Sequence, residues 1–253
     1  MKIIKGIVLC FFFTVSYAGY GQKIVTDRPD QTESSSTIPK KSLQIESGML
    51  IRFAEEGDVS LREIAIPTTL FRYGIGKKIE IRVANTYLNI KEKNTSNEIS
   101  GISDLEIGAK IQLFKNESSK TEIAFLSHAV LPTGTKEVSF ENLGTINKLS
   151  VSHVLSDNLG LGYNIGYNYF GFDNGFLTYS LVLGIAVTES VGMYLEPYGS
   201  VGIFDEHLAN FDAGITYLVK DNFQLDFSFG TGINYTMNYL SAGFSWNIAP
   251  KKD

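Results

Sequence analysis

Residues Leu159–Tyr169 read LGLGYNIGYNY, and this stretch shows the pattern on which the fold depends. Its odd positions are leucine, isoleucine or tyrosine, and its even positions are glycine or asparagine. A period of two predicts a β-strand with one apolar face and one polar face. Tyrosine rings suit the boundary between hydrocarbon and water. A soluble strand can alternate in the same way, so the fold depends on whether the pattern recurs along the chain.

The alternation recurs in twelve segments, the first at 43–53 and the last at 240–248; segment 121–131 is apolar on both faces, which leaves its register open. Short connections alternate with mostly longer ones, such as 91–100 and 133–144. An even strand count and this loop asymmetry are typical of bacterial outer-membrane barrels. We predict an all-β fold, a single transmembrane antiparallel β-barrel of about twelve strands over residues 42–248. A soluble secreted β-sandwich that binds ligands is the alternative.

The first residues have the pattern of a secretory signal peptide. Lys2 and Lys5 precede an apolar run at 7–15, and small residues allow cleavage after position 18 or 21. We therefore expect residues 1–21 to be removed. The only cysteine, Cys10, lies in this region, so the mature chain would have no disulfide, no thiol catalysis and no cysteine-ligated zinc. Residues 249–253 form a short tail after the barrel.

Residues 22–41 have no strand periodicity and contain the motif Asp27, Arg28, Pro29, Asp30. Two prolines and a serine run favour a polar periplasmic linker. The alternating charges of the motif support a second interpretation, in which the segment docks into the barrel lumen as a plug through carboxylate–guanidinium pairs.

Charged side chains on the polar faces of the predicted strands are candidate lumen residues, because a charge facing hydrocarbon would cost about 2–4 kcal/mol. One mixed-sign cluster comprises Arg72, Glu80, Arg82, Asp104, Glu106 and Lys110. These residues favour a structural network of ion pairs, with a polar constriction or a docking site for the plug as the functional alternative. An acidic wall of Glu196, Asp212 and Asp226 has no obvious basic partner, which would favour cations or neutral solutes over anions.

Several motifs resemble those of a family of outer-membrane transporters, common in Gram-negative bacteria and named after the meta-pathway of phenol degradation. They cover nearly all of the mature chain: TDRPDQTES at 26–34, LFRYG at 70–74, IEIR at 79–82, GISDL at 101–105, LPTG at 131–134 and GFS at 243–245. The resemblance implies an outer-membrane β-barrel that passes small, hydrophobic or aromatic molecules.

These observations predict a passive channel in the outer membrane, without cofactor, metal or covalent chemistry. The expected partners are outer-membrane lipid, a small solute and the barrel-insertion machinery, whereas a net charge of −5 argues against nucleic acid. His128, His153 and His207 have no metal-ligand spacing, and no catalytic triad can be inferred. The alternative function is a plugged structural or surface-binding barrel that transports nothing.

Overall fold

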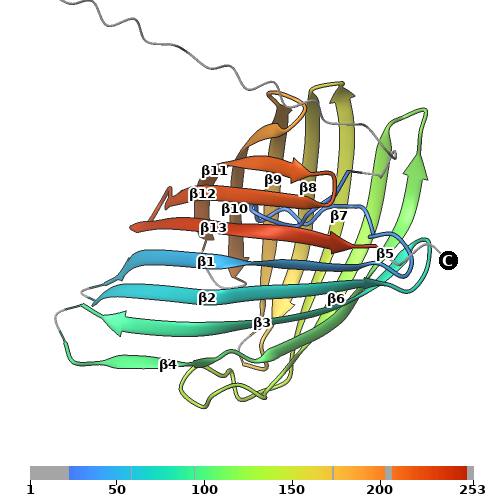
Figure 1. Ribbon diagram of the computed structural model, residues 1–253. Helices are drawn as coiled ribbons and strands as arrows, with labels where there is room; N and C mark the ends of the chain where they lie inside the picture. Colours follow the sequence, from blue (N-terminus) through green and yellow to red (C-terminus); the bar gives the residue numbers. More distant parts are fainter. Residues whose placement is uncertain (1–22, 58, 94, 173, 203–206, 250–253) are drawn as a thin grey trace, which may run out of the picture.

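The computed structural model describes residues 23–57, 59–93, 95–172, 174–202 and 207–249, and it shows a closed antiparallel barrel (Figure 1). The expected signal peptide and residues 250–253 lie outside the described residues. The strands are β1 (Leu43–Glu56), β2 (Val59–Gly74), β3 (Ile79–Glu92), β4 (Glu98–Ile102), β5 (Leu105–Asn116), β6 (Thr121–Leu131), β7 (Gly144–Ser156), β8 (Leu159–Tyr169), β9 (Phe176–Ala186), β10 (Val191–Gly202), β11 (His207–Lys220), β12 (Phe223–Gly232) and β13 (Met237–Ile248).

The barrel closes between the first and the last strand. Leu43 of β1 lies opposite Tyr73 of β2 on one side and Ile248 of β13 on the other. Each long strand therefore has two hydrogen-bonded neighbours around the ring, as a spanning barrel requires. This closure confirms the predicted barrel and shows that the sandwich alternative is wrong. No helix in the described ranges is long and apolar enough to cross a membrane.

The wall has twelve strand positions, although the sheet contains thirteen strands. β4 pairs with one half of β3 and β5 pairs with the other half. β4 and β5 therefore occupy one strand position in the wall, which is interrupted at Ser103 and Asp104. The loop predicted at 91–100 is wrong at its ends: residues 91–92 belong to β3 and residues 98–100 to β4, and the connection runs between them. The polar stretch between β3 and β4 hides the alternation, and only cross-strand pairing with β3 makes the five-residue β4 a strand.

Side chains alternate between a buried lumen face and an exposed outer face. The outer face is apolar: Ile165 is 62% exposed and Leu240 55% exposed. The register of β6, which the sequence left open, is settled by burial, because Ala124, Leu126 and Val130 point inward and are at most 2% exposed. The long strands have between 10 residues (β12) and 16 residues (β2), enough to span a bilayer when tilted.

The two ends of the barrel differ. At one end, which we call the turn end, consecutive strands are joined by short turns such as 157–158 and 221–222. At the other end, the loop end, the connection 132–143 is the longest in the chain. The chain enters β1 and leaves β13 at the turn end, as Figure 1 shows.

Candidate functional site

Residues 23–41, which we call the inner segment, form an irregular loop that enters the barrel at the turn end and returns to it. The Ile24 amide donates to the Asp221 carbonyl in a turn, and the Lys41 amide donates to the Gly74 carbonyl at the end of β2. Between these anchors the segment reaches Asn164 of β8, which accepts a hydrogen bond from the Glu33 amide at 2.7 Å. The segment is therefore not an extended linker outside the barrel.

Asp27 joins the inner segment to three buried cations of the wall. Its carboxylate lies 3.2 Å from Arg72 and 2.8 Å from Lys110, and it lies 2.5 Å from Arg82. All three cations are at most 1% exposed, and Asp27 is 2% exposed. Burial alone would raise the pKa of Asp27, but the positive charges of Arg72, Lys110 and Arg82 outweigh that effect and hold the pKa well below its usual range.

The charge balance of this region depends on the inner segment. The wall supplies the three cations but only two fully buried carboxylates, Glu46 and Glu80, both paired with Arg72. The inner segment adds Asp27 and Glu33, and the Glu33 carboxylate lies 2.8 Å from Arg82. An unpaired buried charge is costly. The buried cations of the wall therefore need the carboxylates of the segment, and those carboxylates need the cations.

Arg28 binds an adjoining part of the wall, formed by β1, β13 and β12. Its Nη2 and Nε atoms donate to the two carboxylate oxygens of Asp226 on β12, at 2.8 and 3.2 Å. The guanidinium lies against Gly48 and Gly243, which face each other across β1 and β13. A Cβ atom at Gly48 would come within 2.6 Å of Arg28 Nη2, so the absence of a side chain makes room for this pair. Asp226 thus has a basic partner that the sequence did not reveal.

The other two members of the predicted acidic wall lie together around Asp30. Glu196 and Asp212 are direct cross-strand partners on β10 and β11, and both are fully buried. Glu196 accepts a hydrogen bond from the Gln31 amide at 2.6 Å, and Asp212 accepts one from the Tyr239 hydroxyl. Among the described residues no cation lies within ion-pair distance of these two carboxylates or of Asp30. Burial, and then the charge of Glu196, raise the pKa of Asp30 well above its usual range.

The predicted mixed-sign cluster is only partly assembled. Arg72, Glu80, Arg82 and Lys110 lie together in the network around Asp27. Glu106 is separated from it by His128, whose Nδ1 lies 2.9 Å from the Glu106 carboxylate and whose Nε2 accepts from Arg82 Nε at 3.1 Å.

Asp104 has a different role from the rest of the predicted cluster. Its carboxylate accepts hydrogen bonds from the Gly134 amide, the Ser139 hydroxyl and the Phe140 amide, all at 2.7–2.9 Å. It therefore holds the long 132–143 connection against the break between β4 and β5.

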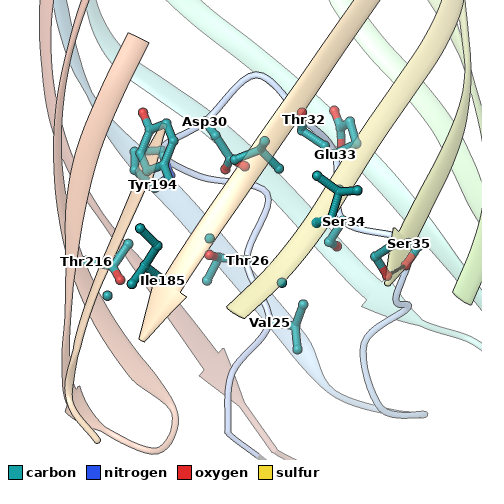
Figure 2. Close-up of a pocket in the computed structure, with 18 of the residues that line it drawn as sticks. Val25, Thr26, Asp30, Thr32, Glu33, Ser34, Ser35, Ile185, Tyr194 and Thr216 are labelled. Carbon is teal, nitrogen blue, oxygen red and sulfur yellow. Dashed lines mark hydrogen bonds between the residues drawn. The ribbon is translucent and has the colours of Figure 1, made fainter. Parts of the chain in front are cut away.

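A cavity of about 480 Å³, which we call the inner cavity, lies between the inner segment and the wall from β7 to β12. Figure 2 shows Val25, Thr26 and Asp30 of the segment on one side and Tyr194 and Thr216 of the wall on the other. A second cavity of about 580 Å³, the mouth cavity, lies at the turn end beside the turns at 157–158 and 187–190. The two cavities share lining residues: Ile24, Ala186, Gly192, Thr216 and Gln224.

Three parts of this site were missed by the sequence analysis. Neither Glu46 nor Glu33 was singled out from the sequence, and His128 was considered only as a metal ligand and rejected. Glu46 could have been identified from the alternation of β1, which places its side chain on the lumen face, next to the segment that precedes the strand. Within the described part of the chain no group of three or more His, Cys, Asp or Glu residues is arranged to hold a metal ion.

Comparisons with known proteins agree with this architecture. The family model described as "Putative MetA-pathway of phenol degradation" matches residues 26–248. No curated protein matches the chain. The solved COG4313 outer membrane channel from Pseudomonas putida F1 is similar with a TM-score of 0.75 at 10% identity, over 85% of this chain and 98% of that one.

Two further channels share the fold at lower similarity. The KdgM porin, solved in complex with disordered oligogalacturonate, has a TM-score of 0.54 at 11% identity, over 81% of this chain and 99% of that one. The CymD monoaromatic hydrocarbon channel has a TM-score of 0.50 at 10% identity, over 85% of this chain and 90% of that one. At such identities the similarity concerns the fold.

Proposed function

This chain belongs to the family described as "Putative MetA-pathway of phenol degradation", and from that membership and the geometry of its lumen we propose a passive outer-membrane channel for small solutes. In this proposal the turn end faces the periplasm and the loop end faces the cell exterior, as in bacterial barrels with short periplasmic turns. The inner segment is an internal plug that narrows the passage. No covalent chemistry is part of the proposal.

The observation that carries the proposal is the pair of adjoining cavities beside the inner segment. They share five lining residues and extend from the periplasmic turns to the level of Thr32 and Ser35 in the segment. A barrel with a purely structural role would not require cavities of this size. The cavities support a path between the plug and one side of the barrel, the side that includes β8.

The lining favours solutes with a large apolar surface. The segment contributes Ile24, Val25 and Pro29 to the inner cavity, and the wall contributes Val154 and Val182. CymD is named a monoaromatic hydrocarbon channel and KdgM was solved with an oligogalacturonate. Between these two ligand classes, the apolar lining of this chain supports the first, small hydrophobic or aromatic molecules.

A plugged barrel without transport is the second candidate function. The specific observation that favours it is the network around Asp27, in which Arg72, Glu80 and Lys110 are fully buried. Planar-bilayer recording together with liposome uptake of a neutral aromatic solute separates the two functions. Transport predicts discrete conductance steps and solute uptake by the wild-type chain or by a chain without residues 22–41. If neither chain conducts or admits solute, the channel proposal fails and the plugged scaffold stands.

A further inference from the structure

Five exposed lysines gather on one side of the turn end, and we call them the basic rim. They lie in three segments of the chain, at 39–41, 75–78 and 117–120: Lys40, Lys41, Lys77, Lys78 and Lys120. Glu117 is the one acidic residue in these segments. Among the described residues the lysines that form ion pairs are Lys91, Lys110, Lys115 and Lys148, so the five lysines of the rim are unpaired there.

The three segments of the basic rim are neighbours at the ends of β2, β3 and β5. The Lys41 amide donates to the carbonyl of Gly74, the last residue of β2, at 2.7 Å. The Gln112 amide of β5 donates to the Lys78 carbonyl at 2.9 Å, and β5 then leads into the turn 117–120. The five lysines therefore form one continuous patch, in which their positive charges add.

The rest of the turn end has the opposite sign. The connections 157–158, 187–190 and 221–222 contain three acidic residues and no lysine or arginine: Asp157, Glu189 and Asp221. All three acidic residues are exposed. An anionic partner is therefore attracted to one side of the turn end and repelled from the other.

The basic rim is continuous with the apolar outer face of the barrel. Tyr73 near the end of β2 is 45% exposed, Ile79 at the start of β3 is 36% exposed, and Ile75 within the turn 75–78 is 45% exposed. Tyrosine rings suit the headgroup region of a bilayer. A lysine beside such residues lays its hydrocarbon stem along the apolar surface while its ammonium group reaches the polar headgroups. A partner of Lys77 and Lys78 is therefore expected at the membrane surface.

We propose that the basic rim binds the phosphate headgroups of anionic phospholipid in the leaflet next to the turn end. Lys77 and Lys78 contact the headgroups directly. The other three lysines of the rim add to the positive potential that concentrates anionic lipid there. Each lysine near an anionic bilayer strengthens the binding of a protein by about fivefold. The proposal requires a barrel that spans a bilayer, and it does not depend on the passage of a solute.

Tryptophan quenching by brominated lipid measures which lipid lies beside each part of the turn end. The chain has a single tryptophan, so Trp246→Phe removes the background. In that chain, Ile79→Trp places the reporter next to Lys78. Val187→Trp is the matched control, because Val187 is 52% exposed and lies in an acidic connection. Each protein is reconstituted in phosphatidylcholine bilayers with increasing amounts of brominated phosphatidylglycerol or of brominated phosphatidylcholine, and the two quenching curves give the preference for the anionic lipid.

The reporter at position 79 should show a preference for phosphatidylglycerol of about fivefold, and the reporter at position 187 should show none. Lys77→Gln together with Lys78→Gln should remove the preference at position 79. Lys23→Gln together with Lys220→Gln, at two exposed lysines outside the rim, should preserve it. Salt at about 1 M should also remove it, because the Debye length falls to about 3 Å.

Two results would overturn the lipid site directly: equal quenching by the two lipids at position 79, or a preference that survives Lys77→Gln with Lys78→Gln. A third would assign the rim to a soluble acidic protein instead. In that case polyglutamate binds to the rim in bilayers of phosphatidylcholine alone, and added phosphatidylglycerol does not compete with it. Competition by phosphatidylglycerol supports the lipid site.

Discussion

Arg28 of the inner segment and Asp226 of β12 form a two-pronged ion pair, with Nη2–Oδ1 and Nε–Oδ2 distances of 2.8 and 3.2 Å. Asp27, the neighbouring residue in the chain, binds three cations of β2, β3 and β5. Two consecutive residues of the inner segment thus attach it to two adjoining parts of the wall, which are separated by β1 and β13. The Gln31 and Glu33 amides donate to Glu196 of β10 and Asn164 of β8, so the segment is held across the lumen, which is the arrangement expected of an internal plug.

Breaking the Arg28–Asp226 pair should loosen the segment. Removing one partner from a fully buried pair costs about 3–5 kcal/mol. Arg28 keeps 16% exposure of its side chain, so we expect Asp226→Asn to cost about 2–3 kcal/mol of docking free energy. Cleavage by the broad-specificity protease proteinase K within residues 24–38 should then be about 30–150 times faster, because proteolysis follows the population of the undocked segment. The control is Arg52→Gln, which breaks the exposed Arg52–Glu63 pair and should leave the cleavage rate unchanged.

Neutralising Asp27 should weaken docking more strongly than neutralising Glu33. Asp27→Asn leaves three buried cations short of a carboxylate, and we expect a cost of about 3–5 kcal/mol. Glu33→Gln should cost less, because Glu33 is 17% exposed. The same cleavage assay measures both effects. Adding Lys110→Met to Asp27→Asn should restore part of the protection, since it removes a cation that has lost its partner. Equal and small effects of Asp27→Asn and Glu33→Gln would show that the charge network does not hold the segment.

Docking should weaken as the pH rises, and Asp30 is the cause. Its pKa is raised in the docked state by burial and by Glu196, so docking retains a proton that the free segment would lose. The contribution of Asp30 is full below about pH 4, its ordinary pKa, and is lost as the pH rises through the raised docked value. Asp27 has a lowered pKa, so its contribution is present above about pH 4 and is lost in stronger acid. The mobility of a nitroxide label at position 37 should therefore increase from mildly acidic to alkaline pH. Asp30→Asn should flatten the alkaline part of this profile, and an unchanged alkaline part would show that Asp30 is not the group responsible.

Ion selectivity should change when the segment is removed. In the intact chain, Asp30, Glu196 and Asp212 lie without a cation partner among the described residues, so the channel should prefer cations or neutral solutes to anions. A chain without residues 22–41 exposes Arg72, Arg82 and Lys110 with fewer carboxylates, and it should shift toward anions. Reversal potentials in a salt gradient measure the ion selectivity of the intact chain and of the shortened chain. Anion preference of the intact channel would contradict this reading of the acidic wall.

The fold could be predicted from alternation alone, because the lumen and lipid faces differ at almost every strand position. LGLGYNIGYNY illustrates this: Ile165 is 62% exposed on the outer face, whereas Asn164 is 4% exposed on the lumen face. β4 could not be predicted, since its strand character comes from pairing with β3 across a polar connection. The register of 121–131 could not be predicted either, because Ala124 and Leu126 are apolar residues that face the lumen.

The site was harder to predict than the fold, because its contacts join residues distant in the chain. Strand alternation predicts that the side chains of Arg72, Arg82 and Lys110 point into the lumen. Their partner Asp27, however, lies in a segment without periodicity. Composition favoured a linker for that segment, and only the geometry shows Arg28 paired with Asp226, 198 residues away. Asp104 is buried, as expected for the lumen face. It binds the 132–143 connection instead of the charge cluster, because the strand is interrupted beside it.

The central claim is that the inner segment occupies the lumen and limits passage through it. Its most direct test is single-channel conductance in three forms of the barrel: wild type, a chain without residues 22–41, and a chain with Ser35→Cys and Ser152→Cys, whose hydroxyl oxygens lie 2.5 Å apart. Cysteines at these positions should form a disulfide that fixes the segment to β7. We predict that deletion raises the conductance, that the disulfide lowers it below the wild-type level, and that reduction restores it. The same conductance in all three forms would contradict the claim.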